Sequence, residues 1–243
     1  MEIVVQKFGG TSVASPDLRE KIAQKAISAM KSGKLPVIVV SAIGRNGDPY
    51  ATDTLILLIG NSKNDIYNRN KDLLMSCGEI ISAVILSNLI NNYGYKSVAL
   101  TGFQAGIITN ENFNNASVLS VDRSKIMDYL NEGYIPVITG FQGISENGNI
   151  TTLGRGGSDT TASIIGEALD AETIEIYTDV DGIMTADPRY IKDANVIDTL
   201  CYDEVYQLAR SGAKVIHPRA VELAERSNIP LIIKNTLSDA KGT

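Results

Sequence analysis

The chain alternates short, almost wholly apolar runs with longer segments in which apolar residues recur at helical spacing. Ile3–Phe8 is predicted to be a short strand, and Leu35–Ser41 is almost wholly apolar, as a strand buried on both faces of a parallel sheet should be. Between them, Ser15 and Pro16 form a helix start, and Gly33 ends the segment. The apolar positions of this helix are Leu18, Ile22, Ala26 and Met30. The pattern therefore predicts a strand, a helix and a second strand in succession.

The same alternation continues to the end of the chain. Further strands are predicted at Ser97–Thr101, Ile135–Thr139, Thr173–Thr178 and Pro230–Lys234. Helices are predicted at Thr54–Ile59, Glu79–Leu89, Arg123–Asn131, Ile164–Leu169, Asp203–Ala209 and Arg219–Glu225. A hairpin turn is predicted at Glu146–Asn149, and the polar segment Asn61–Lys71 is predicted to be an exposed loop or lid. This order predicts an α/β fold, a three-layer α/β/α sandwich with a central, mostly parallel sheet.

The composition is that of an ordinary globular protein with an acidic balance. Of the 243 residues, 44% are hydrophobic and 21% are charged, and the formal net charge is −6. This charge argues against nucleic acid as a partner, because nucleic-acid-binding surfaces are basic. Cys77 and Cys201, the two cysteines, indicate a reducing compartment without a disulfide framework. No run approaches transmembrane length and no signal-peptide pattern is found, so we expect a cytoplasmic protein with no membrane partner.

The segment Thr151–Ala162 carries the clearest candidate chemistry. Its three glycines, at positions 154, 156 and 157, allow tight backbone turns and close approach to a ligand. Ser158 and Asp159 stand where a helix should begin, and the free N–H groups of a helix start favour an anion. Arg155 adds a planar, permanently charged group suited to carboxylate or phosphate. The segment is therefore predicted to bind an anion.

Two further loops follow predicted strands. Lys7 lies at the end of the first strand, before Gly9 and Gly10, whose amides either face a phosphate chain or simply form a turn. Ser41 opens a loop rich in turn-forming residues after the second strand, and loops at one edge of a parallel sheet converge. The chain contains neither G-x-x-x-x-G-K-[ST] nor G-x-G-x-x-G, which argues against a P-loop enzyme and a Rossmann dehydrogenase.

Glu79 and His217 each have two interpretations. Glu79 is at a predicted helix start, where it either complements the helix dipole or, if it faces a pocket, holds a cationic amine. His217 is the only histidine, so any catalytic histidine would have to be this one. Its neighbour Pro218 favours instead a helix start with a structural imidazole. Lys214 lies in the same segment, between two predicted helices.

The loop after the strand Thr173–Thr178 carries three acids and a terminal arginine. A calcium loop would need a denser series of ligands that ends in glutamate, which this loop lacks. A nucleotide fits the loop better, with Asp179 near ribose or adenine and Arg189 near phosphate. We therefore expect a nucleotide at this edge of the sheet.

Five of these segments, taken in order, resemble the motifs of the amino-acid kinase family, and most closely those of the aspartate kinases. They are KFGGTS at Lys7–Ser12, SCGE at Ser76–Glu79, TLGRGGSD at Thr152–Asp159, YTDVDGIMTADPR at Tyr177–Arg189 and SGAKVIHP at Ser211–Pro218. Each motif alone is weak, but five in the same order are specific. The resemblance covers nearly the whole chain, from Lys7 through the last strand.

The resemblance implies transfer of the γ-phosphoryl group of MgATP to the side-chain carboxylate of L-aspartate, which gives 4-phospho-L-aspartate. It implies one catalytic domain over 1–243, with an amino-acid-binding lobe at about 1–150 and a nucleotide-binding lobe at about 151–243. The residues implied to hold aspartate are Ser41, Glu79, Arg155 and Ser158. The residues implied to contact ATP are Lys7, Gly9, Gly10, Thr178, Asp179, Met184, Asp187, Arg189 and Lys214. The implied catalytic residues are Lys7, Lys214 and Asp159, with Asp159 orienting the two lysines, and Mg²⁺ is held mainly by the nucleotide phosphates.

The chemistry of these residues is compatible with that reaction. A carboxylate nucleophile is already ionised at neutral pH, so no general base is needed and a single histidine is no obstacle. Arg155 suits the α-carboxylate of an amino acid and Glu79 suits its free α-amine, a pair that neither a uridylate kinase nor an acetylglutamate kinase would use. Glutamate 5-kinase satisfies the same chemistry, and only the closeness of the motifs favours aspartate over it. A nucleotide-binding regulatory subunit without turnover is the second alternative.

Aspartate kinases commonly continue into a pair of small ACT regulatory domains. This chain reaches Thr243 about where such a region would begin, so we expect no ACT domain within it. Feedback inhibition by lysine or threonine therefore has no predicted site in these residues. We expect the chain to form a homodimer, with L-aspartate and ATP as its small-molecule partners.

Overall fold

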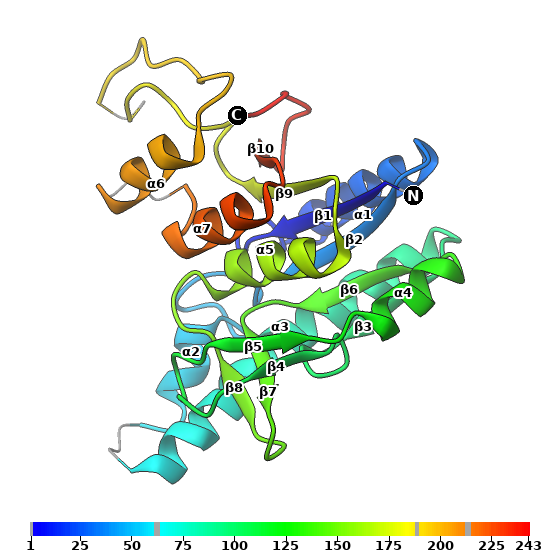
Figure 1. The fold of residues 1–243 in the computed structure, drawn as a ribbon, viewed down its shortest axis with the longest axis vertical. Coiled ribbons are helices and arrows are strands. Elements are labelled where there is room, and N and C mark those ends of the chain that lie inside the picture. The colour runs from blue at the N-terminus through cyan, green and yellow to red at the C-terminus, as the bar shows by residue number, and fades with distance from the viewer. Residues whose placement is uncertain (1, 61–63, 188–189, 212–214) are drawn as a thin grey trace.

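The computed structural model describes residues 2–60, 64–187, 190–211 and 215–243. A six-stranded sheet forms its centre, and helices cover both faces of that sheet (Figure 1). The central strands are β1 (Ile3–Phe8), β2 (Leu35–Val40), β3 (Ser97–Leu100), β6 (Ile135–Thr139), β9 (Thr173–Thr178) and β10 (Leu231–Asn235). They lie in the order β10-β9-β1-β2-β6-β3, and every neighbouring pair is parallel. The predicted three-layer α/β/α fold is confirmed.

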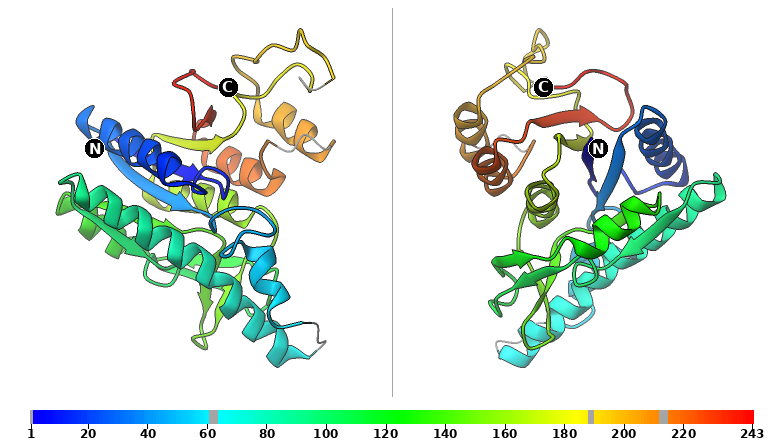
Figure 2. Two further views of the ribbon diagram at one scale, coloured as in Figure 1. Left: turned by 180° about the vertical axis from the view of Figure 1, so that it is seen from behind. Right: turned by 45° about the vertical axis from the view of Figure 1, so that its right-hand side comes forward.

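The helices form two layers around this sheet. They are α1 (Pro16–Lys31), α2 (Thr52–Leu57), α3 (Asp65–Asn92), α4 (Ser124–Asn131), α5 (Gly157–Leu169), α6 (Tyr202–Arg210) and α7 (Pro218–Ser227). Helices α1 and α3 contact each other and lie over one face, as the left view of Figure 2 shows. Helix α5 lies over the opposite face and packs against α7, which in turn contacts α6. These layers bury both faces of the parallel sheet, as its apolar strands require.

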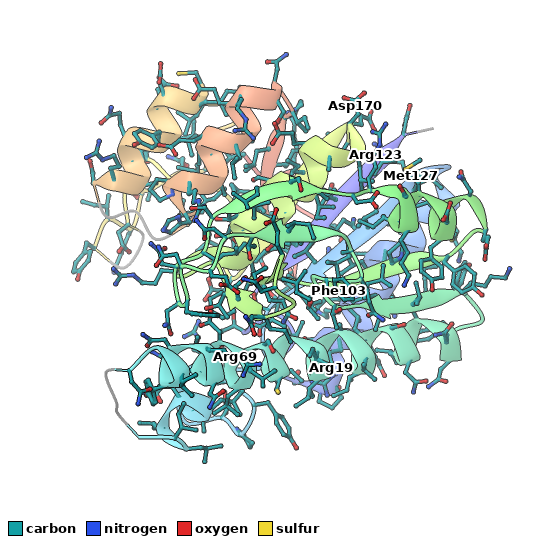
Figure 3. The ribbon with its side chains drawn as sticks, turned by 60° about the horizontal axis from the view of Figure 1, so that its bottom comes forward. Arg19, Arg69, Phe103, Arg123, Met127 and Asp170 are labelled. Carbon is teal, nitrogen blue, oxygen red and sulfur yellow. The ribbon has the colours of Figure 1, made fainter. Side chains whose placement is uncertain are left out.

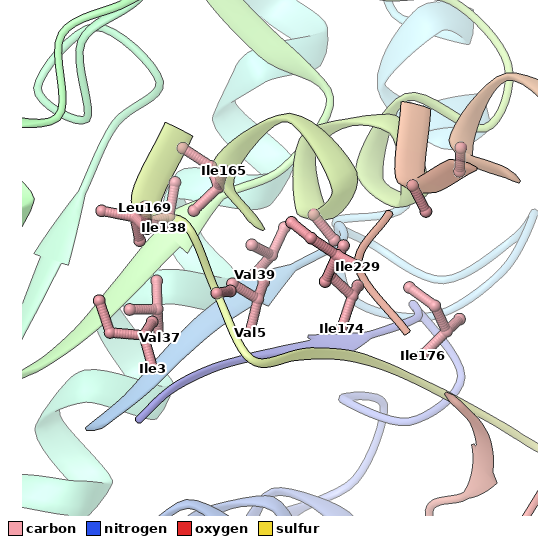
Figure 4. Close-up of a cluster of buried hydrophobic side chains, with 14 of the residues drawn as sticks. Ile3, Val5, Val37, Val39, Ile138, Ile165, Leu169, Ile174, Ile176 and Ile229 are labelled. Atoms are coloured by element: carbon pink, nitrogen blue, oxygen red, sulfur yellow. The ribbon is translucent and has the colours of Figure 1, made fainter. Parts of the chain in front are cut away.

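Side-chain alternation along the strands produces two separate hydrophobic clusters. The cluster on the α5 side includes Val5, Val37, Val39, Ile165 and Leu169, all shown in Figure 4. The cluster on the side of α1 and α3 includes Phe8, Ile22, Ile38, Val40 and Leu86. Strand β2 contributes alternate residues to both clusters, which explains why nearly all of its residues are apolar.

A second, smaller sheet was not predicted. It contains β5 (Val118–Val121), β4 (Ile107–Thr109), β7 (Gln142–Ser145) and β8 (Ile150–Thr152), in the order β5-β4-β7-β8. Strands β7 and β8 form the antiparallel hairpin predicted around Glu146–Asn149. Strands β4 and β5 have only three and four residues, too few for an alternating pattern to stand out in the sequence.

The long helix α3 corrects the prediction for Asn61–Lys71. Residues 65–71 belong to α3 and are not an irregular loop, while 61–63 lie outside the described residues. The helix begins after Asn64, whose side chain accepts a hydrogen bond from Tyr67 N at 2.6 Å. The segment Ser76–Glu79 consequently lies inside α3 and does not start a helix. The division into two lobes near residue 150 stays a prediction.

Helix α3 is also unusually apolar for its length. Its residues Ile66–Asn92 are long and apolar enough to cross a membrane, and half of its most apolar window is buried within the fold. This differs from the expectation that no run approaches transmembrane length. The helix packs against β2, β3, β6 and α1, and buried core helices pass the same test of length and composition. Its packing against the sheet accounts for the apolar inner face.

Candidate active site

A cleft of about 460 Å³ lies at the carboxyl ends of β1 and β2, beside the start of α5. Seven of the predicted site residues line it, namely Lys7, Gly10, Ser41, Glu79, Arg155, Ser158 and Asp159. They come from segments far apart in the chain. Lys7, Gly10 and Ser41 meet because they lie at the carboxyl ends of the parallel neighbours β1 and β2. Glu79 reaches the cleft from α3, and the other three residues lie at the start of α5. The four residues predicted to hold an amino acid are all among them.

The start of α5 has the geometry predicted for an anion site. Gly156 caps the helix with φ = 69°, in the left-handed region that favours glycine. A Cβ atom on Gly156 would also lie 2.2 Å from Cγ of His217, so no side chain fits at this position. The first turn then presents Gly157, Ser158 and Asp159 to the cleft, where N–H groups without intrahelical partners favour a negative charge.

Lys7 and Asp159 form an ion pair in the cleft. Lys7 Nζ lies 2.5 Å from Asp159 Oδ1, and their side chains are only 12% and 13% exposed. Lys7 is the penultimate residue of β1, with β2 and β9 as its two neighbours, so its position is determined by the centre of the sheet. The predicted role of Asp159 in orienting Lys7 requires this contact, and the role itself stays a prediction.

Glu79 is a buried carboxyl group that faces the cleft from the middle of α3. Its residue is 2% exposed, and Ala42 N donates a hydrogen bond of 3.1 Å to Oε1. The other oxygen, Oε2, is buried without a hydrogen-bond partner in the described part of the chain. Removal from water raises the pKa of Glu79 to about 8. Because Glu79 is far from either end of α3, the interpretation that it complements a helix dipole is wrong.

Arg155 offers the opposite charge in the same cleft. Its side chain is exposed, and within the described residues it has no ion-pair or hydrogen-bond partner. Ser41 and Ser158 line the same cleft and bring hydroxyl groups that can donate or accept. A free guanidinium and a buried carboxyl with an unpaired oxygen therefore face one cavity.

The glycines after β1 have different environments. A Cβ atom on Gly10 would lie 2.6 Å from Gly44 O and 2.7 Å from Ala42 O, so Gly10 permits close packing of two loops at the cleft. Gly9 does not line the cleft; its carbonyl accepts from Ser12 N at 2.9 Å in a turn. The turn interpretation therefore holds for Gly9, and contact with phosphates stays a prediction for both glycines.

The predicted ATP contacts after β9, together with Lys214, lie outside the cleft lining or outside the described residues. Thr178 ends β9, and Asp179 Oδ2 accepts from Arg45 Nη2 at 3.0 Å, so Asp179 contacts a residue that lines the cleft. Met184 pairs with Val196 in an isolated β-bridge farther along the same loop, which also contains Asp187. Neither Met184 nor Asp187 lines the cleft. Arg189 and Lys214 lie outside the described residues.

The remaining sequence interpretations concern His217 and the cysteines. His217 caps α7, and its Nδ1 accepts from Arg219 N at 3.4 Å, which agrees with a structural imidazole at a helix start. Both cysteines are free thiols, as expected for a chain without a disulfide framework. In the part of the chain that the structure describes, no three His, Cys, Asp or Glu side chains gather as they would around a metal ion.

Sequence reasoning missed several residues of the cleft. Lys71 and Met75 line it together with Glu79, at intervals of four residues along one face of α3. This spacing could have been found if the helix had been extended through the polar segment. Asn114 and Phe141 also line the cleft, and both have positive φ angles, 66° and 70°. No local pattern marks these two positions.

Fold and cleft together define a class of protein. It is an α/β protein with a small-ligand site at the carboxyl edge of its parallel sheet, and that site presents both acidic and basic side chains. The chain matches the amino acid kinase family over residues 2–235. It therefore belongs to the amino acid kinase family.

Among its relatives, Aspartokinase 1 of Bacillus subtilis is 46% identical over 243 residues, an alignment that covers 100% of this chain and 60% of the relative. The crystal structure of aspartate kinase from Synechocystis has a TM-score of 0.84 and 40% identity, and covers 99% of this chain and 39% of that one. The structure of E. coli aspartokinase III in complex with aspartate and ADP has a TM-score of 0.84 and 28% identity, and covers 100% of this chain and 64% of that one. This chain thus spans about three fifths of the curated relative's length.

Proposed function

We propose that this chain is the catalytic domain of an ATP-dependent aspartate kinase. It transfers the γ-phosphoryl group of ATP to the side-chain carboxylate of L-aspartate and yields 4-phospho-L-aspartate and ADP. The similarity to Aspartokinase 1 of B. subtilis along the whole chain supports this proposal. The observation that carries it is the buried Glu79 carboxyl, whose Oε2 lacks a partner among the described residues, opposite the exposed Arg155 guanidinium in one cleft with Lys7.

The pair suits the two ends of a free α-amino acid. The ammonium group of aspartate would bind Glu79, whose buried Oε2 lacks a partner among the described residues, and would stabilise the ionised form of that carboxyl. The planar guanidinium of Arg155 would bind both oxygens of the α-carboxylate. Ser41 and Ser158 line the same space and would hydrogen-bond the substrate. The side-chain carboxylate is then left free to face the phosphates.

Phosphoryl transfer requires two anions to approach each other. An oxygen of the substrate's side-chain carboxylate forms a bond to the γ-phosphorus while the bond from that phosphorus to the bridging oxygen breaks, and ADP leaves with the bond's electron pair. Lys7, held by Asp159, would stabilise the charge on the transferring group together with Lys214 and the amides at Gly9 and Gly10. No general base is needed, because the nucleophile is already ionised.

The nucleotide would bind beside the cleft, on the loop that follows β9. The complex of E. coli aspartokinase III with aspartate and ADP supports a nucleotide and an amino acid in one fold of this kind. Thr178, Asp179, Met184, Asp187 and Arg189 are the proposed contacts. Mg²⁺ is expected to be held mainly by the nucleotide phosphates, whose oxygens are the hard ligands that it prefers. It offsets their negative charge when bound.

The proposed activity implies a biosynthetic role for the chain. Aspartate phosphorylation is the first step towards lysine, threonine and methionine, and a cytoplasmic homodimer is proposed for the chain. No nucleic-acid or membrane partner is proposed.

A substrate comparison tests the proposal. ADP release is measured with L-aspartate, L-glutamate and N-acetyl-L-aspartate at saturating ATP. We expect the highest kcat/KM for L-aspartate, and a loss of at least tenfold for the N-acetylated compound because it leaves Glu79 unpaired. Preference for L-glutamate would replace the proposed substrate with that of a glutamate 5-kinase. ATP binding without turnover of any of the three would indicate a regulatory subunit.

A further inference from the structure

Asp72 is a fully buried carboxylate of α3 to which the proposed mechanism gives no role. Its exposed fraction is 0%, and it lies seven residues before Glu79 on the same helix. Asn114 N donates to both of its oxygens at 3.0 Å. Thr152 donates twice more, from its N at 2.8 Å and from its Oγ1 at 2.9 Å. Burial raises the pKa of Asp72 above its ordinary value, and the hydrogen bonds from these donors, which favour the ionised form, oppose part of that rise.

The two segments that Asp72 holds form one wall of the cleft. Thr152 is the last residue of β8 and precedes Gly154 and Arg155, which line the cleft. Asn114 lines the cleft itself. A Cβ atom on Gly154 would lie 3.1 Å from Asn114 O, so the two segments are in close contact. A displacement of either would therefore move the backbone that carries Arg155.

Asn114 has an unfavourable backbone conformation, which the hydrogen bonds from its N–H to Asp72 help to stabilise. Its φ angle of 66° is in the left-handed region, which is unfavourable for residues other than glycine, although asparagine tolerates it better than most. Ionised carboxylate oxygens accept hydrogen bonds and donate none, so Asp72 can serve all the donors that converge on it. A carboxamide at the same position would turn its NH₂ group towards at least one of these donors.

We infer that Asp72 is a positioning residue that holds Arg155 and Asn114 in place for the amino-acid substrate. Helix α3 then acts on two groups of the substrate. Glu79 binds the α-amine directly, and Asp72 positions Arg155, which binds the α-carboxylate, by way of Thr152. Arg69, labelled in Figure 3, adds a contact from this helix to the β7–β8 turn, where its Nε donates to Asn149 Oδ1 at 2.7 Å. This inference rests on the proposed function for the identity of the substrate and on the geometry alone for the positioning.

The kinetic test is Asp72→Asn. We expect KM for L-aspartate to rise about tenfold or more, because a small displacement of a binding group is costly, while KM for ATP changes less than about twofold. In an Arg155→Ala background the same substitution should change KM for aspartate by less than about twofold, since the two residues act as one unit. Equal losses for both substrates, or full additivity with Arg155→Ala, would overturn the inference.

Glu111→Gln is the matched control. Glu111 is an exposed acid close to Asn114 in the chain, and its carboxylate accepts from Ser145, Asn147 and Asn149 near the β7–β8 turn. It does not line the cleft. We expect both KM values of Glu111→Gln to stay within about twofold of the parent values, because this variant weakens the loop without moving Arg155.

Amide hydrogen exchange tests the positioning without any turnover. In Asp72→Asn, the amides of Asn114 and Thr152 should exchange at least about tenfold faster, while amides in β1 and β9 remain protected. Unchanged exchange at these two amides would overturn the inference even if the chain phosphorylates aspartate. Faster exchange in a chain that does not turn over aspartate would keep the positioning and reject the proposed substrate.

Discussion

Glu79 gives the proposed amino-acid site a measurable pH dependence. Burial raises the pKa of this carboxyl to about 8 in the unliganded protein. An ammonium group binds well only to the ionised form, so aspartate must bind to the fraction of molecules in which Glu79 has lost its proton. Lowering the pH through 8 should therefore weaken the binding of aspartate.

The size of this effect follows from the fraction ionised. With a pKa of about 8, roughly half of the Glu79 carboxyls are ionised at pH 8, about a tenth at pH 7 and about a hundredth at pH 6. If bound aspartate keeps the carboxyl ionised across this range, its dissociation constant rises about fivefold from pH 8 to pH 7 and about ninefold more from pH 7 to pH 6. The affinity for ATP should change much less, because its proposed site does not include Glu79.

Isothermal titration calorimetry with L-aspartate, in the presence of a non-hydrolysable ATP analogue, measures this dependence. Proton uptake or release is obtained by repeating each titration in buffers of different ionisation enthalpy. We expect binding near pH 7 to release close to one proton per aspartate bound. The variant Glu79→Gln should bind aspartate weakly at every pH and show no such slope. A dissociation constant that is flat from pH 6 to pH 8, without proton release, would refute the assignment of Glu79 to the amine.

Three further predictions concern the cleft and its support. Lys7→Ala should lower kcat by roughly 10² or more, the scale for one lost charge contact in a transition state. A change below about threefold in the ADP-release assay would mean that Lys7 does not contact the transferring group. Burial raises the pKa of Glu79 from 4.5 to about 8 in the folded state. The contribution of its protonation to the free energy of unfolding is therefore fully present below about pH 4.5 and is lost as the pH rises to about 8. Thermal melts should accordingly show Glu79→Gln gaining several degrees over the parent protein between about pH 5 and pH 8, and a pH-independent difference would contradict this. In denaturant unfolding, Gly156→Ala should lose clearly more stability than Gly133→Ala, because both glycines have positive φ but only Gly156 faces His217. Gly133→Ala alone should cost about 1–2 kcal/mol. Equal losses for the two variants would reject the steric argument.

The sequence predicted those parts of the fold whose signal is local. Strand β2 is recognisable because both of its faces are buried, so nearly every residue is apolar. The start of α5 is recognisable because its glycines meet a backbone requirement, which the φ angle of Gly156 confirms. Lys7, Gly10 and Ser41 meet at one cleft because β1 and β2, which precede or contain them, are parallel.

The sequence could not predict features that depend on distant contacts. The first turns of α3 are polar, and no apolar face marked them as helical, although Asn64 is a usable capping signal. Asp72 resembles any other acid in the sequence, because its partners lie 42 and 80 residues away along the chain. Asn114 could not be placed in the cleft either, because its position follows from the short strands of the second sheet. Only the folded chain brings these residues to the wall that carries Arg155.

The central claim is phosphoryl transfer from ATP to aspartate, and trapping of the acyl phosphate tests it most directly. The purified chain is incubated with MgATP, L-aspartate and hydroxylamine, and aspartyl hydroxamate and ADP are quantified together. The proposed function predicts hydroxamate that requires both substrates and matches ADP in amount, and Lys7→Ala should lose nearly all of it. Binding of ATP and aspartate without hydroxamate, or ADP release that does not depend on aspartate, would contradict the claim.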